Sequence, residues 1–133
     1  MLAALRPIRE GTPLLVKSFD PAVVARLAAM DPGCPVGLLV GQAPGPIRAA
    51  LRPPRAALKT AVEACRELRA DFLSPHQGLL ADEAAAHAEL AEMPTYPWTV
   101  NAPAAMSRLA LLPIRGMITD RPDLLLQVVR GAT

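Results

Sequence analysis

Short apolar runs alternate with longer helical segments about five times along the chain, and this alternation limits the folds that it can form. The runs expected to be strands cover residues 14–18, 36–40, 72–74, 95–100 and 116–119. Each is followed by a segment that favours a helix. Parallel strands need a crossover connection between them, and a helix supplies one. The sequence therefore predicts an α/β fold in which helices cover a parallel sheet.

Residues that favour helix N-termini mark where several of these helices begin. Asp20 is followed by Pro21, Asp82 precedes an alanine-rich run, and Asn101 stands two residues before Pro103. An oxygen of such a side chain can accept a hydrogen bond from the first turn, where proline is also tolerated. The predicted helices cover residues 22–30, 56–70, 83–92, 103–112 and 122–129. The Gly/Pro-rich connection at 41–54 favours no regular element.

Two architectures contain such a run of β-α units. A doubly wound sheet could close as a small domain of 133 residues, whereas a (β/α)₈ barrel typically needs about 250 residues. The start resembles the last turn of a helix, at residues 2–5. The alternation alone leaves both architectures open.

Composition and charge exclude several classes of protein. The 14 basic and 12 acidic residues are spread along the whole chain and aromatic residues make up 3%, so neither a basic patch nor a base-stacking surface is expected. No nucleic-acid partner is predicted. Cys34 and Cys65 lie far apart, which gives little support for a zinc site or a disulfide. The absence of a long apolar run and of a secretion signal predicts a cytoplasmic protein without a membrane span.

Four motifs, in order, carry a resemblance to a known family. They are Ser18-Phe-Asp-Pro21, Leu73-Ser-Pro-His-Gln-Gly-Leu-Leu80, Trp98-Thr-Val-Asn101 and Ile118-Thr-Asp-Arg-Pro-Asp-Leu124. Together they resemble the C-terminal half of the glycerophosphodiester phosphodiesterase family. That resemblance implies a partial TIM-type (β/α) barrel of about five consecutive βα units, spanning residues 1–133 as the C-terminal portion of the domain. It also implies a role in lipid metabolism: hydrolysis of a glycerophosphodiester to glycerol phosphate and an alcohol, assisted by calcium or magnesium.

The chain lacks the family's catalytic and metal-binding motifs. The family's two catalytic histidines come from an early His-Arg-Gly and a following His-Asp, and its metal carboxylates lie on early strands; none of these motifs occurs here. Asp20, Asp82 and Asp120 are better explained as helix caps. We therefore predict no catalytic residue and no bound metal in this chain alone, and expect it to be inactive by itself.

Several residues remain candidates for substrate binding at the carboxyl ends of the strands, where barrel enzymes place their sites. Trp98 could contact substrate or pack in the rim. Asn101 could cap a helix or reach a ligand, with capping favoured. His76, in a Pro/Gly loop, could contact phosphate or glycerol or face solvent. His87, on a helix, and Arg121, near a helix N-terminus, are expected at the surface.

Three neighbouring residues end the first predicted strand on the same rim. Alternate strand residues face opposite sides of a sheet, so only one of Lys17 and Ser18 can point into the barrel. We expect Ser18 to point inward, with Lys17 or Phe19 contributing from the rim. A lysine in that position could meet a phosphate as a point charge.

Three hypotheses follow for the whole chain. The first is the C-terminal half of a phosphodiesterase barrel, whose full-length form would bind the glycerophosphodiester substrate. The second is a non-catalytic half barrel that acts as a binding or assembly module. The third is a truncated gene product. In each, open sheet edges would favour self-association.

Overall fold

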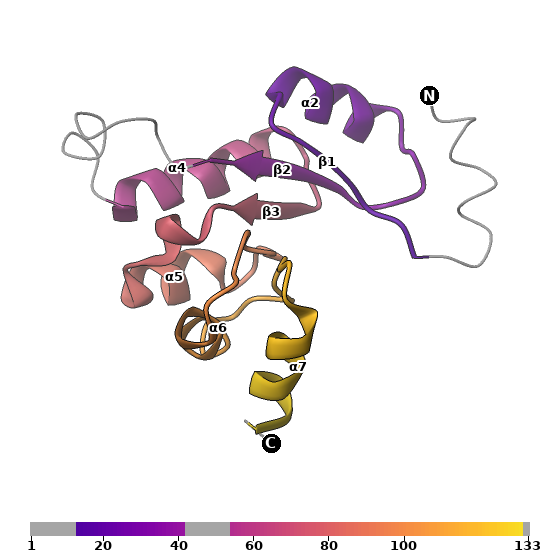
Figure 1. Cartoon of the computed structure of the whole chain (residues 1–133). Helices are drawn as coiled ribbons and strands as arrows, with labels where there is room; N and C mark the ends of the chain where they lie inside the picture. Colours follow the sequence, from indigo (N-terminus) through magenta and orange to yellow (C-terminus); the bar gives the residue numbers. More distant parts are fainter. Residues whose placement is uncertain (1–12, 42–53, 132–133) are drawn as a thin grey trace.

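A computed structural model describes residues 13–41 and 54–131 of the chain. Its sheet contains three parallel strands in consecutive order, namely β1 (Val16–Ser18), β2 (Val36–Val40) and β3 (Phe72–Pro75). Figure 1 shows the strands side by side, with helices packed along them. The predicted strands at 14–18, 36–40 and 72–74 are confirmed to within two residues at each end. The predictions for residues 2–5 and for most of 41–54 lie outside the described residues.

The helices follow the strands in the predicted alternation. Their bounds are α2 (Pro21–Ala29), α4 (Pro54–Glu67), the 3₁₀ helix η1 (Gln77–Leu80), α5 (Glu83–Leu90), α6 (Pro103–Leu109) and α7 (Pro122–Gly131). Each predicted helix is present, although α4 and α6 end three residues earlier than predicted. In α4 the reason is local: Arg69 adopts a left-handed conformation with φ 56°, and the amide of Ala70 bonds back to the carbonyl of Cys65.

Two of the predicted helix caps are confirmed and two are wrong. The Asp20 carboxylate accepts a hydrogen bond from the amide of Ala22, and the Asp82 carboxylate accepts one from Ala85. The N-cap of α6 is Ala102, which makes no side-chain cap bond. Asn101 and Asp120 instead bond to each other across two loops. The sequence could not reveal this partner because the two residues are 19 positions apart.

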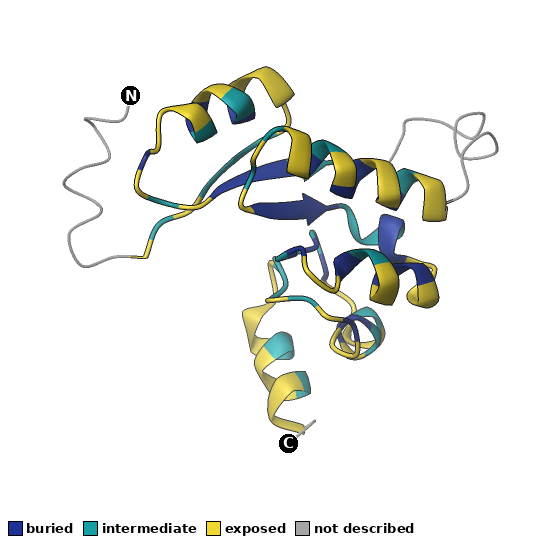
Figure 2. Cartoon of the chain, turned by 180° about the vertical axis from the view of Figure 1, so that it is seen from behind, coloured by how far each residue is buried: buried dark blue, intermediate teal, exposed yellow. Residues whose placement is uncertain are grey.

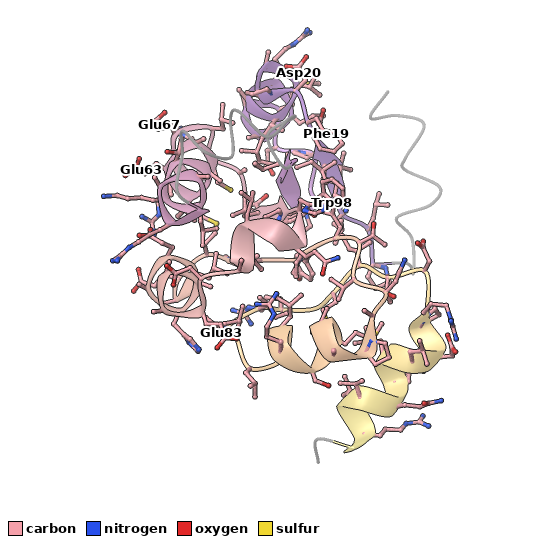
Figure 3. The ribbon with its side chains drawn as sticks, turned by 60° about the vertical axis from the view of Figure 1, so that its left-hand side comes forward. Phe19, Asp20, Glu63, Glu67, Glu83 and Trp98 are labelled. Carbon is pink, nitrogen blue, oxygen red and sulfur yellow. The ribbon has the colours of Figure 1, made fainter. Side chains whose placement is uncertain are left out.

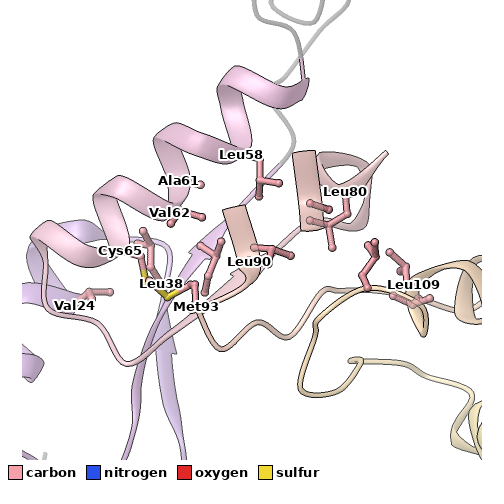
Figure 4. Packing of buried hydrophobic residues seen from close by; sticks show 14 of the residues in the cluster. Val24, Leu38, Leu58, Ala61, Val62, Cys65, Leu80, Leu90, Met93 and Leu109 are labelled. Atoms are coloured by element: carbon pink, nitrogen blue, oxygen red, sulfur yellow. The ribbon is translucent and has the colours of Figure 1, made fainter. Parts of the chain in front are cut away.

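The hydrophobic core lies between the sheet and helices α2, α4 and α5. Strand residues Leu38 and Leu73 face the helices and pack in one cluster with helix residues, and Figure 4 shows this packing around α4. The buried helix residues in the cluster include Val24, Leu27, Leu58, Ala61, Val62, Cys65 and Leu90. Burial raises the pKa of the Cys65 thiol to about 11. This layer holds the sheet in the shape that positions the strand ends.

The opposite face of the sheet corresponds to the interior of a barrel. Lys17, Gly37 and Phe72 lie in register on this face. The Phe72 ring lies directly over Gly37, so closely that a Cβ at this position would clash with the ring. The ring also meets Tyr96 edge to face, with centroids 5.4 Å apart. Two aromatic rings therefore fill the interior beside the middle of the sheet.

The prediction of a regular strand at 95–100 is wrong, although the segment follows the course of a fourth strand. It pairs with β3 through two isolated parallel bridges, Leu73 with Thr95 and His76 with Trp98. A regular ladder would need an amide at position 75 to donate to Tyr96, and a proline has none. The Ser74 hydroxyl makes that bond instead, 2.9 Å from the Tyr96 carbonyl oxygen. The strand course is kept while the backbone ladder is interrupted.

The prediction of a regular strand at 116–119 is also wrong, whereas its parallel direction is confirmed. The Ile118 amide donates to the carbonyl of Pro97, and the Ile118 carbonyl accepts from Val100. A regular parallel ladder would use the amide of residue 99 for the second bond, so the neighbouring segment 95–100 carries one extra residue here. Five consecutive parallel strand positions thus remain, two of them irregular.

The five strand positions and their helices form one sector of a barrel. Residues in the middle of this sector are more buried than those at its two ends (Figure 2). Strands β2 and β3 are largely buried, whereas α7 contains no buried residue. The exposed large apolar side chains at the β1–α2 end are Leu15, Phe19, Val23 and Met30, and those at the α7 end are Leu126 and Val129. The arrangement is that of an open barrel sector. Within the described ranges, no helix combines the length and apolar character that crossing a membrane requires.

Candidate functional site

An aromatic cluster lies at the carboxyl ends of the strands. Trp98 sits between Phe19, which follows β1, and His76, which follows β3, with ring centroids 5.7 Å and 5.2 Å away. Both contacts are edge to face, the geometry that aromatic quadrupoles favour. Figure 3 shows Phe19 and Trp98 close together, while Glu63, Glu67 and Glu83 project from outer helices. The structure therefore brings together three of the predicted site residues.

The tryptophan of this cluster is held by a hydrogen bond but remains partly exposed to solvent. Its indole N–H donates to the Ser74 carbonyl oxygen at 2.8 Å, which satisfies its one polar group. Trp98 is half-buried, and Phe19 remains 59% exposed. Apolar ring surface is thus presented at the rim of the sector. This surface suits the carbon skeleton of a small ligand.

His76 is held in one orientation by a local hydrogen bond. Its Nδ1 accepts from the amide of Gly78 at 3.1 Å and so caps η1. The acceptor role of Nδ1 places the proton of a neutral imidazole on Nε2. No side chain or backbone group in the described ranges bonds Nε2, so this N–H is available to donate to a ligand oxygen. His76 is partly buried against Trp98 and is not a freely solvated loop residue.

The expectation that Ser18 points inward is wrong. Ser18 pairs in register with Leu38, which lies on the face covered by helices, and its hydroxyl accepts from the amide of Asp20. Lys17 takes the inward position, and its Nζ donates to the Ser74 hydroxyl oxygen at 3.4 Å. Burial lowers the pKa of Lys17 below its usual value. Strand alternation lets only one of the two residues face the interior, and the register shows that it is Lys17.

Two side chains fasten the loops around Trp98, and sequence reasoning missed one of them. Gln77 donates to the Thr99 carbonyl oxygen at 2.6 Å. Asn101 accepts from the Thr119 hydroxyl and from the Asp120 amide, and donates to the Asp120 carboxylate. Gln77 stood inside a quoted motif, but no local pattern indicated its distant partner. These bonds join the ends of the third, fourth and fifth strand positions.

Two residues expected at the surface are found there. Arg121 forms a two-point pair with the Asp123 carboxylate, with the closer nitrogen 2.8 Å from oxygen, and the hydrogen bond lowers the pKa of Asp123. His87 is exposed on α5. Neither belongs to the aromatic cluster.

The described residues do not fit a bound divalent metal. In residues 13–41 and 54–131, no three His, Cys, Asp or Glu side chains gather in one place. Asp20 and Asp82 cap helices, and Asp120 accepts from Asn101. Calcium and magnesium prefer several converging oxygen ligands. The described residues of the site can therefore supply apolar contact, an imidazole N–H and an ammonium group.

Comparison with known proteins gives this geometry a context. The model of the glycerophosphoryl diester phosphodiesterase family matches residues 1–124. Among curated proteins, none matched the chain significantly.

Three solved structures have a similar fold. A protein from Silicibacter pomeroyi, assigned to the glycerophosphoryl diester phosphodiesterases, has a TM-score of 0.76 at 22% identity. The matched region covers 98% of this chain and 42% of the Silicibacter protein. A glycerophosphodiester phosphodiesterase from Parabacteroides distasonis has a TM-score of 0.72 at 15% identity, covering 98% and 49%. An Oleispira antarctica phosphodiesterase, solved in complex with the product sn-glycerol-3-phosphate, has a TM-score of 0.68 at 17% identity, covering 96% and 48%. The chain thus spans less than half the length of each of these three structures.

Proposed function

The chain belongs to the glycerophosphoryl diester phosphodiesterase family, and from that membership we propose that residues 1–133 form the C-terminal portion of a phosphodiesterase barrel. The portion contributes substrate contacts at the rim and interior. The acid/base groups and the metal ligands come from the strand positions that this sector lacks. The complete barrel hydrolyses a glycerophosphodiester to glycerol phosphate and an alcohol.

The observation that carries this proposal is the aromatic cluster at the carboxyl ends of the strands. Barrel enzymes build their sites on this face, from the loops that follow different strands. Phe19 and Trp98 would pack against the carbon skeleton of the substrate, while the His76 Nε2–H would donate to one of its oxygens. Asn101 supports the cluster through its bonds to the neighbouring loop.

The proposal separates binding from chemistry. A calcium or magnesium ion, held elsewhere in the barrel, would stabilise charge on the phosphoryl oxygens. Among the described residues, no three His, Cys, Asp or Glu side chains gather to hold such an ion. General acid/base assistance is typically worth about 10² to 10⁴ in rate, so the rim contacts cannot replace it. We also place the protein in the cytoplasm and in lipid metabolism.

The first test measures hydrolysis of glycerophosphocholine in the presence of calcium or magnesium. The 133-residue chain alone should show no turnover above background. A barrel completed by a second chain, carrying the family's His-Arg-Gly and His-Asp strands, should restore it. Robust activity of the 133-residue chain that is lost in His76→Ala would overturn the proposal, since it would make His76 part of the catalytic machinery.

A second test asks whether Trp98 positions substrate. In the completed barrel, Trp98→Ala should raise KM by about tenfold or more, since it removes an apolar contact surface. Leu111→Ala is the matched control because Leu111 is 74% exposed and lies outside the aromatic cluster. Equal kinetic constants for both variants and the wild type would remove Trp98 from the site.

A second candidate function is favoured by the apolar ends of the sector. Exposed Leu15, Val23 and Met30 at one end, and Leu126 and Val129 at the other, suit a half barrel that pairs with another chain. Such an assembly module would need no catalysis. Light scattering should give a dimer or larger species, since among residues 13–41 and 54–131 β1 pairs on one edge only. A stable monomer at high concentration would count against it.

A further inference from the structure

We infer that Lys17, held in position by Ser74, forms an oxyanion-binding subsite inside the barrel, one step below the aromatic rim, that holds the phosphate group of the substrate. This inference deepens the proposed function and rests on it. It assigns the anionic part of the ligand to the Lys17 ammonium, which Ser74 orients and which is distinct from the Phe19, Trp98 and His76 cluster.

The first support is position. Lys17 lies on the interior face, in register with Gly37 and Phe72, while Phe19 stands two residues further along on the rim. Residues two apart on a strand face the same side. The Lys17 ammonium therefore lies between the Phe72–Tyr96 pair deeper in the barrel and the Phe19–Trp98 pair at the rim.

The second support is the charge balance around the lysine. In the described ranges the ion pairs join Lys59 to Glu63 and Arg121 to Asp123, both at the surface, and none involves Lys17. Its Nζ donates to the neutral Ser74 hydroxyl oxygen at 3.4 Å. Burial lowers the pKa of Lys17, which is the expected cost of desolvating an ammonium without a counter-charge. An anion in contact would reverse that cost.

The third support is the orientation of the hydroxyl. Ser74 is fully buried, and its hydroxyl proton is committed to the Tyr96 carbonyl oxygen at 2.9 Å. Its oxygen then accepts from the Lys17 ammonium, which fixes the ammonium in the interior. An ammonium has three donors, and this contact uses one of them. The remaining donors are available to phosphoryl oxygens.

The chain offers an internal control for testing this subsite. It contains two lysines, Lys17 and Lys59, and the latter is exposed in its pair with Glu63. An amine-acylating reagent modifies only the neutral amine, and mass spectrometry of peptides distinguishes the two positions. With saturating sn-glycerol-3-phosphate, labelling of Lys17 should slow about tenfold or more, because an opposite charge in contact raises a lysine pKa. Labelling of Lys59 should not change.

Two further probes separate the anion from the rest of the ligand. Inorganic phosphate should protect Lys17 as well, whereas glycerol should not. Equal protection of both lysines, or protection by glycerol alone, would overturn the subsite. Protection of neither lysine by the two phosphates would do the same.

Variants provide a second readout, the fluorescence of Trp98. This residue is the sole tryptophan, and its indole bonds to the Ser74 backbone, so ligand in the subsite should change its emission. Lys17→Gln should weaken binding of sn-glycerol-3-phosphate about tenfold or more, and Lys17→Arg should retain most of it because the positive charge remains. Lys59→Gln is the matched control. Identical affinity in Lys17→Gln and the wild type would refute the assignment.

The outcome is separable from that of the proposed function. If Lys17 is protected but the completed barrel does not hydrolyse a glycerophosphodiester, the subsite stands and the proposed reaction falls. If hydrolysis occurs while Lys17→Gln leaves KM unchanged and Lys17 unprotected, the reaction stands and the subsite falls.

Discussion

The strands β1 to β3 and the segment 94–119 follow one continuous barrel course, yet different groups hold them together. In β1 to β3, backbone amides and carbonyls pair in a regular parallel ladder. In the later segment, two isolated bridges remain, and the side chains of Ser74, Gln77 and Asn101 complete the connections. The difference shows that the backbone can keep the path of a strand without a regular hydrogen-bond ladder, where side chains supply the missing donors.

Position in the sector adds a second contrast. The middle strands pack against helices on one face and against aromatic rings on the other, so a substitution there removes many contacts. The two ends carry exposed apolar residues, and substituting them removes few contacts within this chain. Stability should therefore be concentrated in the middle, and the ends should respond mainly to assembly.

The largest effect is expected at the centre of the core. Leu73→Ala should lower the free energy of unfolding by about 2–5 kcal/mol, because it removes a fully buried side chain and leaves a cavity. Leu126→Ala, at a 52% exposed position on α7, should stay within about 0.5 kcal/mol of the wild type. Denaturant unfolding of both variants measures the contrast. Equal losses at the two positions would contradict a concentration of stability in the middle.

An intermediate effect is expected where the hydroxyl replaces the ladder bond. Ser74→Ala should cost about 1–3 kcal/mol, because it leaves the Tyr96 carbonyl without its partner. In Pro75→Ala a backbone amide is present again and can donate to that carbonyl. The double variant should therefore lose less than the sum of the two single variants, as a double-mutant cycle would show. Strict additivity would argue against this compensation.

A smaller effect is expected where exposed loops are joined. Asn101→Ala should cost about 1 kcal/mol in the free energy of unfolding, since its bonds to Thr119 and Asp120 are exposed to solvent. Hydrogen exchange should also become faster at the Asp120 amide, which donates to Asn101. Ala102→Ser is a useful comparison because it places a hydroxyl at the true N-cap of α6. An unchanged exchange rate at the Asp120 amide in Asn101→Ala would contradict the role of Asn101 in joining the loops.

The smallest perturbation compares the two thiols without changing the sequence. Cys65 is fully buried and its pKa is raised to about 11, so little thiolate exists near pH 8 and alkylation should be slow in the native state. Cys34 is partly exposed and should react first. Denaturant should bring both thiols to similar rates. Equal rates in the native protein would show that the layer between α4 and the sheet opens readily.

Much of the fold could be predicted because it depends on local patterns. Asp20 and Asp82 cap the helices that their sequence context indicated, since a cap bonds within three residues of itself. Trp98, Phe19 and His76 were singled out from motifs at strand ends and do converge. The regular strand predicted for 95–100 was wrong because Pro75 on the neighbouring strand has no amide to donate. The regular strand predicted for 116–119 was wrong because the 95–100 segment carries an extra residue opposite Ile118.

Other features depended on partners distant in the sequence. Asn101 has a side chain suited to capping a helix, but its amide forms hydrogen bonds to residues 18 and 19 positions away. The role of Ser74 exists only because Pro75 stands opposite a carbonyl from another segment. Sequence patterns describe which bonds a residue can make, whereas the partner that it meets is set by packing.

The sequence by itself determined the alternation of strands and helices, most helix starts, the family and the residues that gather at the rim. These follow from hydrophobic spacing, capping chemistry and motifs, which are properties of neighbouring residues. Tertiary structure decided that Lys17 rather than Ser18 faces the interior, and that side chains replace part of the ladder. Sheet register decides both, because a shift of one residue exchanges the two faces of a strand.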